Sequence, residues 1–154
     1  MTMLASIRPH DIDVALFVHV AGAMILVGGL LTAAAAAIVG WRDESGRLQR
    51  ISYLSLLAVA LPGYIVMRVG AEWTYSKEHL GDLPGGDPTW IGIGYATADI
   101  GALLLLIALV VGGIGLYRAR GGGGGGLLKA SAVIATVLVA AYVVAIWAMG
   151  GKPS

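Results

Sequence analysis

Four long apolar runs constrain the fold of this sequence more than any other feature. They cover residues 14–40, 51–69, 90–117 and 127–149. An α-helix rises about 1.5 Å per residue, so each run is long enough to cross the roughly 30 Å hydrocarbon core of a bilayer. Because lipid offers no hydrogen bonds to the backbone, spanning segments must satisfy their own N–H and C=O groups. The sequence therefore predicts an all-α polytopic membrane protein, a bundle of four transmembrane helices.

The composition fits lipid as the main solvent. Of the 154 residues, 58% are hydrophobic and 12% are charged, against about 25% charged in a typical soluble domain. The connections are short, so we expect a single membrane domain over residues 1–154. The absence of cysteine excludes disulfides, thiolate metal sites and a thiol nucleophile. No basic run indicates binding to nucleic acid.

The basic residues predict the orientation of the bundle. Six of the ten Lys and Arg residues lie in or beside the connections between spans one and two and between spans three and four. Loops rich in Lys and Arg stay on the cytoplasmic side. We therefore expect both termini, and the connection between spans two and three, to face outward from a bacterial inner (cytoplasmic) membrane. The six residues are Arg42, Arg47, Arg50, Arg118, Arg120 and Lys129.

Three backbone patterns give further expectations. Pro62 should kink the second helix near mid-membrane, because proline lacks the N–H that a helix needs. The six glycines at 121–126 predict a flexible tether. Small residues recur at helix-packing spacing in the first and third runs, which predicts that these two spans form the central, closely packed pair.

Ionisable residues inside the apolar runs indicate a functional site, because each costs roughly 2.5–3.5 kcal/mol at mid-membrane. His19 lies in the first run, Arg68 and Glu72 lie one turn apart toward the outer end of the second, and Asp99 lies in the third. Counted from the outer ends of their helices, His19, Arg68 and Asp99 are about 8–13 Å deep. We expect an ion pair between Arg68 and Asp99, since a lone charge would cost more.

Aromatic residues extend this predicted cluster. Tyr64 and Tyr95 offer further hydrogen bonds, and Trp73 and Trp90 would frame the entrance, although interfacial aromatic belts account for these tryptophans equally well. The cluster either only orders the bundle or forms an outward-opening pocket for a lipid, a small ligand, an ion or a proton.

His19 has three competing interpretations. A hydrogen bond to Asp99 or to a backbone carbonyl is the first. The second is a metal or haem ligand, with Met67 as the other axial ligand, and the third is a proton-relay residue.

The stretches HVAGAMILVGGLL, LPGYIVMRVGAEW and WIGIGYATADIGALLLLIA resemble an uncharacterised family of small four-helix integral membrane proteins of high-GC Gram-positive bacteria. The first stretch, a histidine followed by glycines, is also similar to copper-resistance D type membrane proteins and to diheme membrane cytochromes. Those proteins carry several intramembrane histidines, whereas this chain has His19. The resemblance implies the four-helix topology and, as an alternative function, binding of haem b or copper.

Enzymatic function is the least favoured class, because no nucleophile with a base, metal-binding quartet or nucleotide fingerprint is present. The sequence favours a small binding or accessory subunit that contacts membrane lipid, as a homo-oligomer or within a larger membrane complex. The alternatives are a haem- or metal-binding membrane protein and a small transporter or channel.

Overall fold

The structure, a computed structural model, describes residues 10–42, 46–79 and 89–151. The elements are α1 (His10–Val39), η1 (Gly40–Arg42), α2 (Arg47–Ser55), η2 (Leu56–Ala60), α3 (Leu61–Lys77), α4 (Thr89–Ala119) and α5 (Gly125–Gly151). Four spans are long and apolar enough to cross a membrane, since α2, η2 and α3 join into one. The described residues contain no strand. The chain is therefore an all-α, four-helix membrane bundle, as the sequence predicted.

The second span is longer than its apolar run. It covers Arg47–Lys77, which is 31 residues, so the helix continues past residue 69, where the predicted run ends, and includes Trp73. The i, i+4 ion pair between Arg68 and Glu72 supports the helix in this polar stretch. Lys77, in the last turn, adds a charge that complements the helix dipole.

The helices pack as two hairpins, which corrects the predicted pairing of spans one and three. α1 packs against α3, and α4 packs against α5. Gly22 and Gly29 of α1, which predicted contact with the third span, instead face the second. A Cβ on Gly29 would lie 2.7 Å from the backbone nitrogen of Ala60, and one on Gly63 would lie 2.5 Å from that of Leu26. Small residues let neighbouring backbones approach closely, as expected in lipid. The close approach is between helices that follow one another in the sequence, and not between spans one and three.

The third span uses its glycines in the same way against α5. A Cβ on Gly101 would lie 2.6 Å from the hydroxyl of Tyr142, and one on Gly112 would lie 2.9 Å from that of Ser131. The hydrophobic core joins the two hairpins in the middle of the bundle. Its largest fully buried side chains are Leu26, Leu30, Leu56, Leu105 and Leu138.

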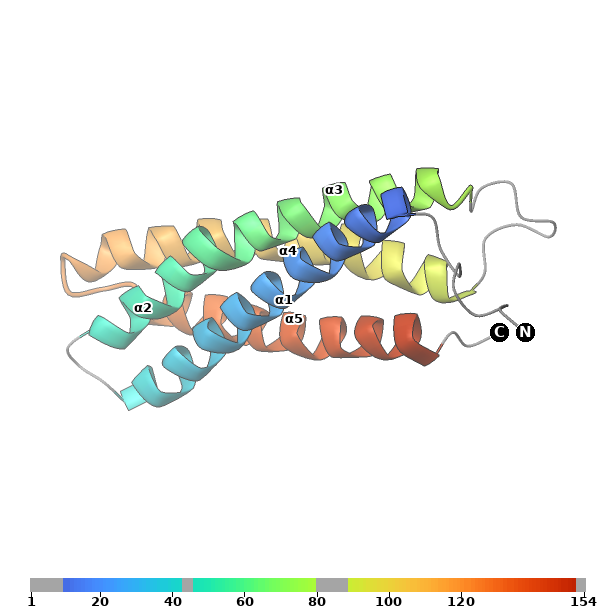
Figure 1. Cartoon of the computed structure of the whole chain (residues 1–154). Helices are drawn as coiled ribbons and strands as arrows, with labels where there is room; N and C mark the ends of the chain where they lie inside the picture. Colours follow the sequence, from blue (N-terminus) through green and yellow to red (C-terminus); the bar gives the residue numbers. More distant parts are fainter. Residues whose placement is uncertain (1–9, 43–45, 80–88, 152–154) are drawn as a thin grey trace, which may run out of the picture.

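The two ends of the bundle differ in charge. α1 begins, α3 ends, α4 begins and α5 ends at one end, which we call the terminal end (Figure 1). The other end carries η1, the start of α2 and the turn between α4 and α5. We call it the basic end, because Arg42, Arg47, Arg118, Arg120 and Lys129 lie there.

The backbone irregularity near Pro62 takes the form of a π-helical segment. η2, Leu56–Ala60, lies directly before Leu61 and Pro62, and the N–H of Leu61 bonds to the carbonyl of Leu56, five residues back. Helices are commonly bent at prolines and at π-bulges. The structure therefore places a π-helical segment directly before the proline, and the predicted kink at Pro62 stays a prediction.

The predicted glycine tether is wrong: residues 121–124 form a tight turn, and Gly125 already belongs to α5. Gly122 and Gly124 have φ angles of 83° and 88°, which L side chains rarely adopt. The N–H of Gly123 bonds to the carbonyl of Arg118 at 3.1 Å. Glycine's access to positive φ thus closes the turn between two antiparallel helices.

Candidate functional site

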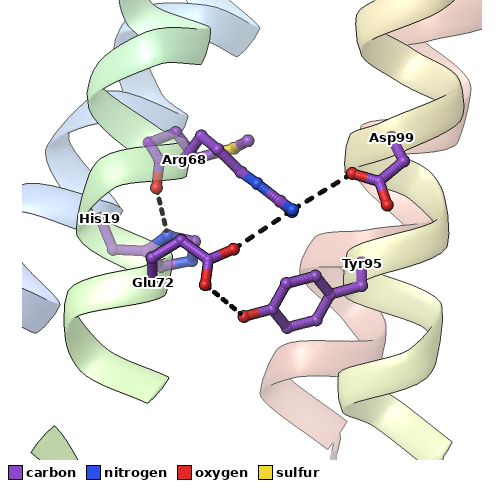
Figure 2. A network of polar contacts seen from close by, with 6 residues as sticks. His19, Arg68, Glu72, Tyr95 and Asp99 are labelled. Carbon is purple, nitrogen blue, oxygen red and sulfur yellow. Dashed lines mark hydrogen bonds and ion pairs between the residues drawn. The ribbon is translucent and has the colours of Figure 1, made fainter. Parts of the chain in front are cut away.

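Five of the predicted residues come together at the terminal end. We call them the polar cluster: His19 of α1, Arg68 and Glu72 of α3, and Tyr95 and Asp99 of α4. Figure 2 shows Arg68 reaching from α3 across to Asp99, with Glu72 and Tyr95 beside it. The cluster therefore bridges the two hairpins, where α3 and α4 meet.

Arg68 binds both carboxylates through a single nitrogen. Its Nη2 lies 3.2 Å from Oε1 of Glu72 and 3.3 Å from Oδ1 of Asp99. The guanidinium carbon lies 4.7 Å from the ring centroid of Tyr95, which is cation–π geometry. Tyr95 in turn donates its hydroxyl to Oε2 of Glu72 at 3.3 Å. One aromatic ring and two acids thus fix the guanidinium of Arg68.

The cluster has an excess of negative charge. It holds one arginine and two carboxylates, so its net charge is −1 when both acids are ionised and His19 is neutral. The Arg68 side chain is 28% exposed, while those of Glu72 and Asp99 are 53% and 64% exposed. The acids therefore lie toward the outside of the bundle, and Arg68 extends from the interior to meet them.

His19 forms one of the hydrogen bonds that the sequence allowed. Its Nδ1 lies 3.0 Å from the backbone carbonyl oxygen of Met67. Since a carbonyl only accepts, Nδ1 carries the proton, and Nε2 is left as the other ring position. The contact needs the close approach of α1 and α3, which Gly22 and Gly70 allow: a Cβ on either would strike the backbone of Met67 or His19.

A large cavity lies beside the polar cluster. Its volume is about 760 Å³, within the roughly 300–1,000 Å³ typical of ligand pockets. All four spans line it. His19, Met67, Arg68, Trp90 and Tyr95 are among the lining residues, and most of the others are apolar.

The cavity opens sideways, between α1 and α5. Met24 of α1 and Ile146 of α5 both line it, and both are more than half exposed. In Figure 1, α1 runs obliquely across the bundle, and its first half lies nearer to α3 than to the end of α5. Since the surrounding solvent of these faces is lipid, the opening connects the cavity with the bilayer.

Four of the predicted residues do not line this cavity: Tyr64, Glu72, Trp73 and Asp99. Tyr64 packs against the hydrophobic core. Trp73 is 40% exposed, and only Trp90 of the two predicted entrance tryptophans lines the cavity. Glu72 and Asp99 reach the site through Arg68 and are not among its lining residues.

Two tyrosines that line the cavity, Tyr75 and Tyr142, were not among the residues that the sequence predicted for the site. Tyr75 lines the cavity, and its ring lies edge-on to that of Tyr95 with centroids 5.8 Å apart. Tyr142 also lines it and is 5% exposed, and its hydroxyl has no hydrogen-bond partner among the described residues. Tyr75 lies two turns after Arg68, and Tyr142 is the one tyrosine of the fourth run. Both signals were available in the sequence.

Both predicted haem ligands, His19 and Met67, line the cavity, and their hydrogen bond joins the imidazole of His19 to the backbone carbonyl of Met67. Haem binding by this pair stays a prediction. In the described part of the chain, no group of three or more His, Cys, Asp or Glu residues could hold a metal ion. His19 and Met67 together offer only one imidazole and one thioether.

Comparisons with protein families, with curated proteins and with solved structures found no match to the chain. The site geometry is therefore the basis for a functional proposal.

Proposed function

We propose that this protein is a small membrane binding or accessory subunit that holds one lipid-like amphipathic molecule in the cavity at the terminal end. The observation that carries the proposal is the sideways opening of a 760 Å³ cavity beside a charged cluster. A ligand can enter from the bilayer between α1 and α5 without crossing water.

The walls suit a hydrocarbon chain. Val20, Ala23 and Val27 of α1 line the cavity, as do Ala145 and Ile146 of α5. In lipid, apolar side chains and lipid tails are equally apolar, so selective binding depends on shape and on polar contacts. The polar cluster supplies those contacts.

Arg68 provides the hydrogen-bond donors. Both of its ion pairs use Nη2, while a guanidinium carries five N–H groups in a fixed fork. The N–H groups on Nη1 and Nε can bind a phosphoryl or carbonyl oxygen. Because two acids already give the cluster a net charge of −1, an uncharged or zwitterionic head group is favoured over an anionic one.

We further propose that the basic end lies in the cytoplasm of a bacterium, so that the cavity opens to the outer leaflet of the inner membrane. The support is the concentration of arginines at that end.

Two glycine variants test the proposal. Gly28 lines the cavity and has open space where a Cβ would be, so we expect the ring of Gly28→Phe to occupy part of the cavity. Gly92 has equally open space but lies outside the lining, so Gly92→Phe is the matched control. Native mass spectrometry with phosphatidylethanolamine, diacylglycerol and phosphatidylglycerol measures binding.

Lipid bound in this cavity should be lost in Gly28→Phe and retained in Gly92→Phe. We expect this binding to be stronger for phosphatidylethanolamine or diacylglycerol than for phosphatidylglycerol. If no lipid signal distinguishes the two variants, the proposal is wrong. A Soret absorbance band in the purified protein would instead favour the haem alternative.

A further inference from the structure

A second cavity lies at the basic end, away from the polar cluster. Its volume is about 190 Å³, several times the roughly 30 Å³ that one water occupies in the liquid. Residues from α1, η1, α2, α4 and α5 line it, so all four spans contribute to its walls.

The cavity has a positive electrostatic character. Lys129 is the one charged residue among its described lining residues, and none of these is acidic. The ammonium of Lys129 lies 5.0 Å from the ring centroid of Trp41, which also lines the cavity. Gly125 lines it as well and begins α5, where the helix dipole places a partial positive charge.

Hydroxyl and amide groups line the cavity together with Lys129. Gln49 donates its amide N–H to the carbonyl of Gly40 at 2.5 Å, and Ser131 donates its hydroxyl to that of Ala108 at 2.9 Å. These two donors are therefore occupied. Ser52, buried, and Tyr53 also line the cavity and add two more hydroxyls.

We propose that this cavity binds the phosphate of an anionic phospholipid from the leaflet at the basic end. A phosphate oxygen would accept hydrogen bonds from Lys129 and the hydroxyls near it, close to the start of α5. Arg50 and the five basic residues that define this end outnumber the two acidic residues of the same connections, Asp43 and Glu44, so this end attracts anionic lipid. On binding, the ammonium of Lys129 would leave the face of the Trp41 ring and bind the phosphate instead. The site shares no lining residue with the cavity of the proposed function, so an experiment can contradict one proposal without contradicting the other.

Trp41 supplies the reporter. In a protein whose other tryptophans, Trp73, Trp90 and Trp147, are replaced by Phe, its emission reports movement of Lys129 off the ring. The full-length protein in mild detergent is titrated with short-chain phosphatidylglycerol, with diacylglycerol and with inorganic phosphate.

We expect phosphatidylglycerol to give a saturable change that diacylglycerol does not. An equal change with inorganic phosphate would support the phosphate site but identify a soluble anion as its occupant. The same response to diacylglycerol, or no response to phosphatidylglycerol, would overturn the proposal.

Charge variants separate a site from general attraction. Lys129→Gln should weaken phosphatidylglycerol binding about fivefold, the effect of one basic residue near an anionic surface. Arg120→Gln removes the same charge at the same end but lies outside the lining, so it should change affinity less than twofold. Lys129→Arg should restore most of the binding. Equal losses in Lys129→Gln and Arg120→Gln would show that no specific site exists.

Discussion

The imidazole of His19 and the backbone carbonyl of Met67 lie 3.0 Å apart, which joins α1 to α3 through a side chain and a backbone. The bond is possible because Gly70 lets the two helix backbones approach. A Cβ at Gly70 would strike the backbone nitrogen of His19. A backbone atom cannot rotate out of the way as a side chain can, so the glycine sets the spacing of the helices.

Gly70→Ala should therefore destabilise the protein by about 2–3 kcal/mol, as overpacking of a close contact does. Heat denaturation in mild detergent, followed by tryptophan fluorescence, measures the loss. Gly28→Ala is the control, since nothing lies within 4 Å of its Cβ position. There we expect a change of at most about 1 kcal/mol, in the stabilising direction, because alanine favours a helix over glycine. Equal effects of the two variants would contradict the close contact.

The ion pair between Arg68 and Asp99 should give a measurable coupling energy. Asp99 is 64% exposed, so we expect about 0.5–1.5 kcal/mol, in the range found for interhelical polar contacts in membranes. The measurement is a double-mutant cycle with Arg68→Gln and Asp99→Asn. A cycle of Asp99→Asn with Arg120→Gln, at the other end of the bundle, should be additive. Additivity in the first cycle as well would mean that Arg68 and Asp99 do not interact.

The turn between α4 and α5 makes opposite predictions for neighbouring glycines. Gly124→Ala should cost about 1–2 kcal/mol, because φ is 88° there and a Cβ would also strike the carbonyl of Gly115. Gly126→Ala, inside the first turn of α5 with open space around its Cβ, should be neutral or stabilising by up to about 1 kcal/mol. Thermal unfolding of both variants compares them. A flexible tether would tolerate both substitutions equally.

The orientation predicts the activity of reporter fusions. A reporter after Arg47 should score as cytoplasmic and one after Ser154 as external, because basic connections remain inside. Activity in the opposite pattern would reverse the bundle, and would assign the large cavity to the inner leaflet.

The sequence predicted the spans and the polar cluster because both follow from one-dimensional rules. Length and hydropathy define a span, and depth along a helix brought Arg68 and Asp99 to one layer. The sequence did not predict which helix each glycine contacts, because a small residue permits close approach by any neighbouring helix. Which helix approaches depends on short connections, which favoured the two hairpins.

The direction in which each side chain points could not be predicted from the sequence either. Depth alone could not show that Asp99 would lie toward the outside while Arg68 lines the cavity, because that depends on the rotation of each helix about its axis. The extent of α3 was missed for another reason. Hydropathy ends the second run at residue 69, whereas polar contacts continue the helix to Lys77.

The π-helical segment Leu56–Ala60 sets that rotation for α3. Ser55 donates its hydroxyl to the carbonyl of Gly29, and Ala60 packs against the same glycine, although the two are five residues apart. Five residues at 100° each in an α-helix would leave them on different faces. The π-helical segment thus accommodates one residue more than an α-helix would between these two contacts. Deleting one residue from it would leave the two flanking positions four residues apart, which an ordinary α-helix places on one face, so Arg68 would still point at α4. Deleting two residues would turn everything beyond Pro62 by about 100°, and Arg68 would point away from α4. The polar cluster at the terminal end therefore depends on the length of a stretch, Leu56–Ala60, that contains no polar side chain.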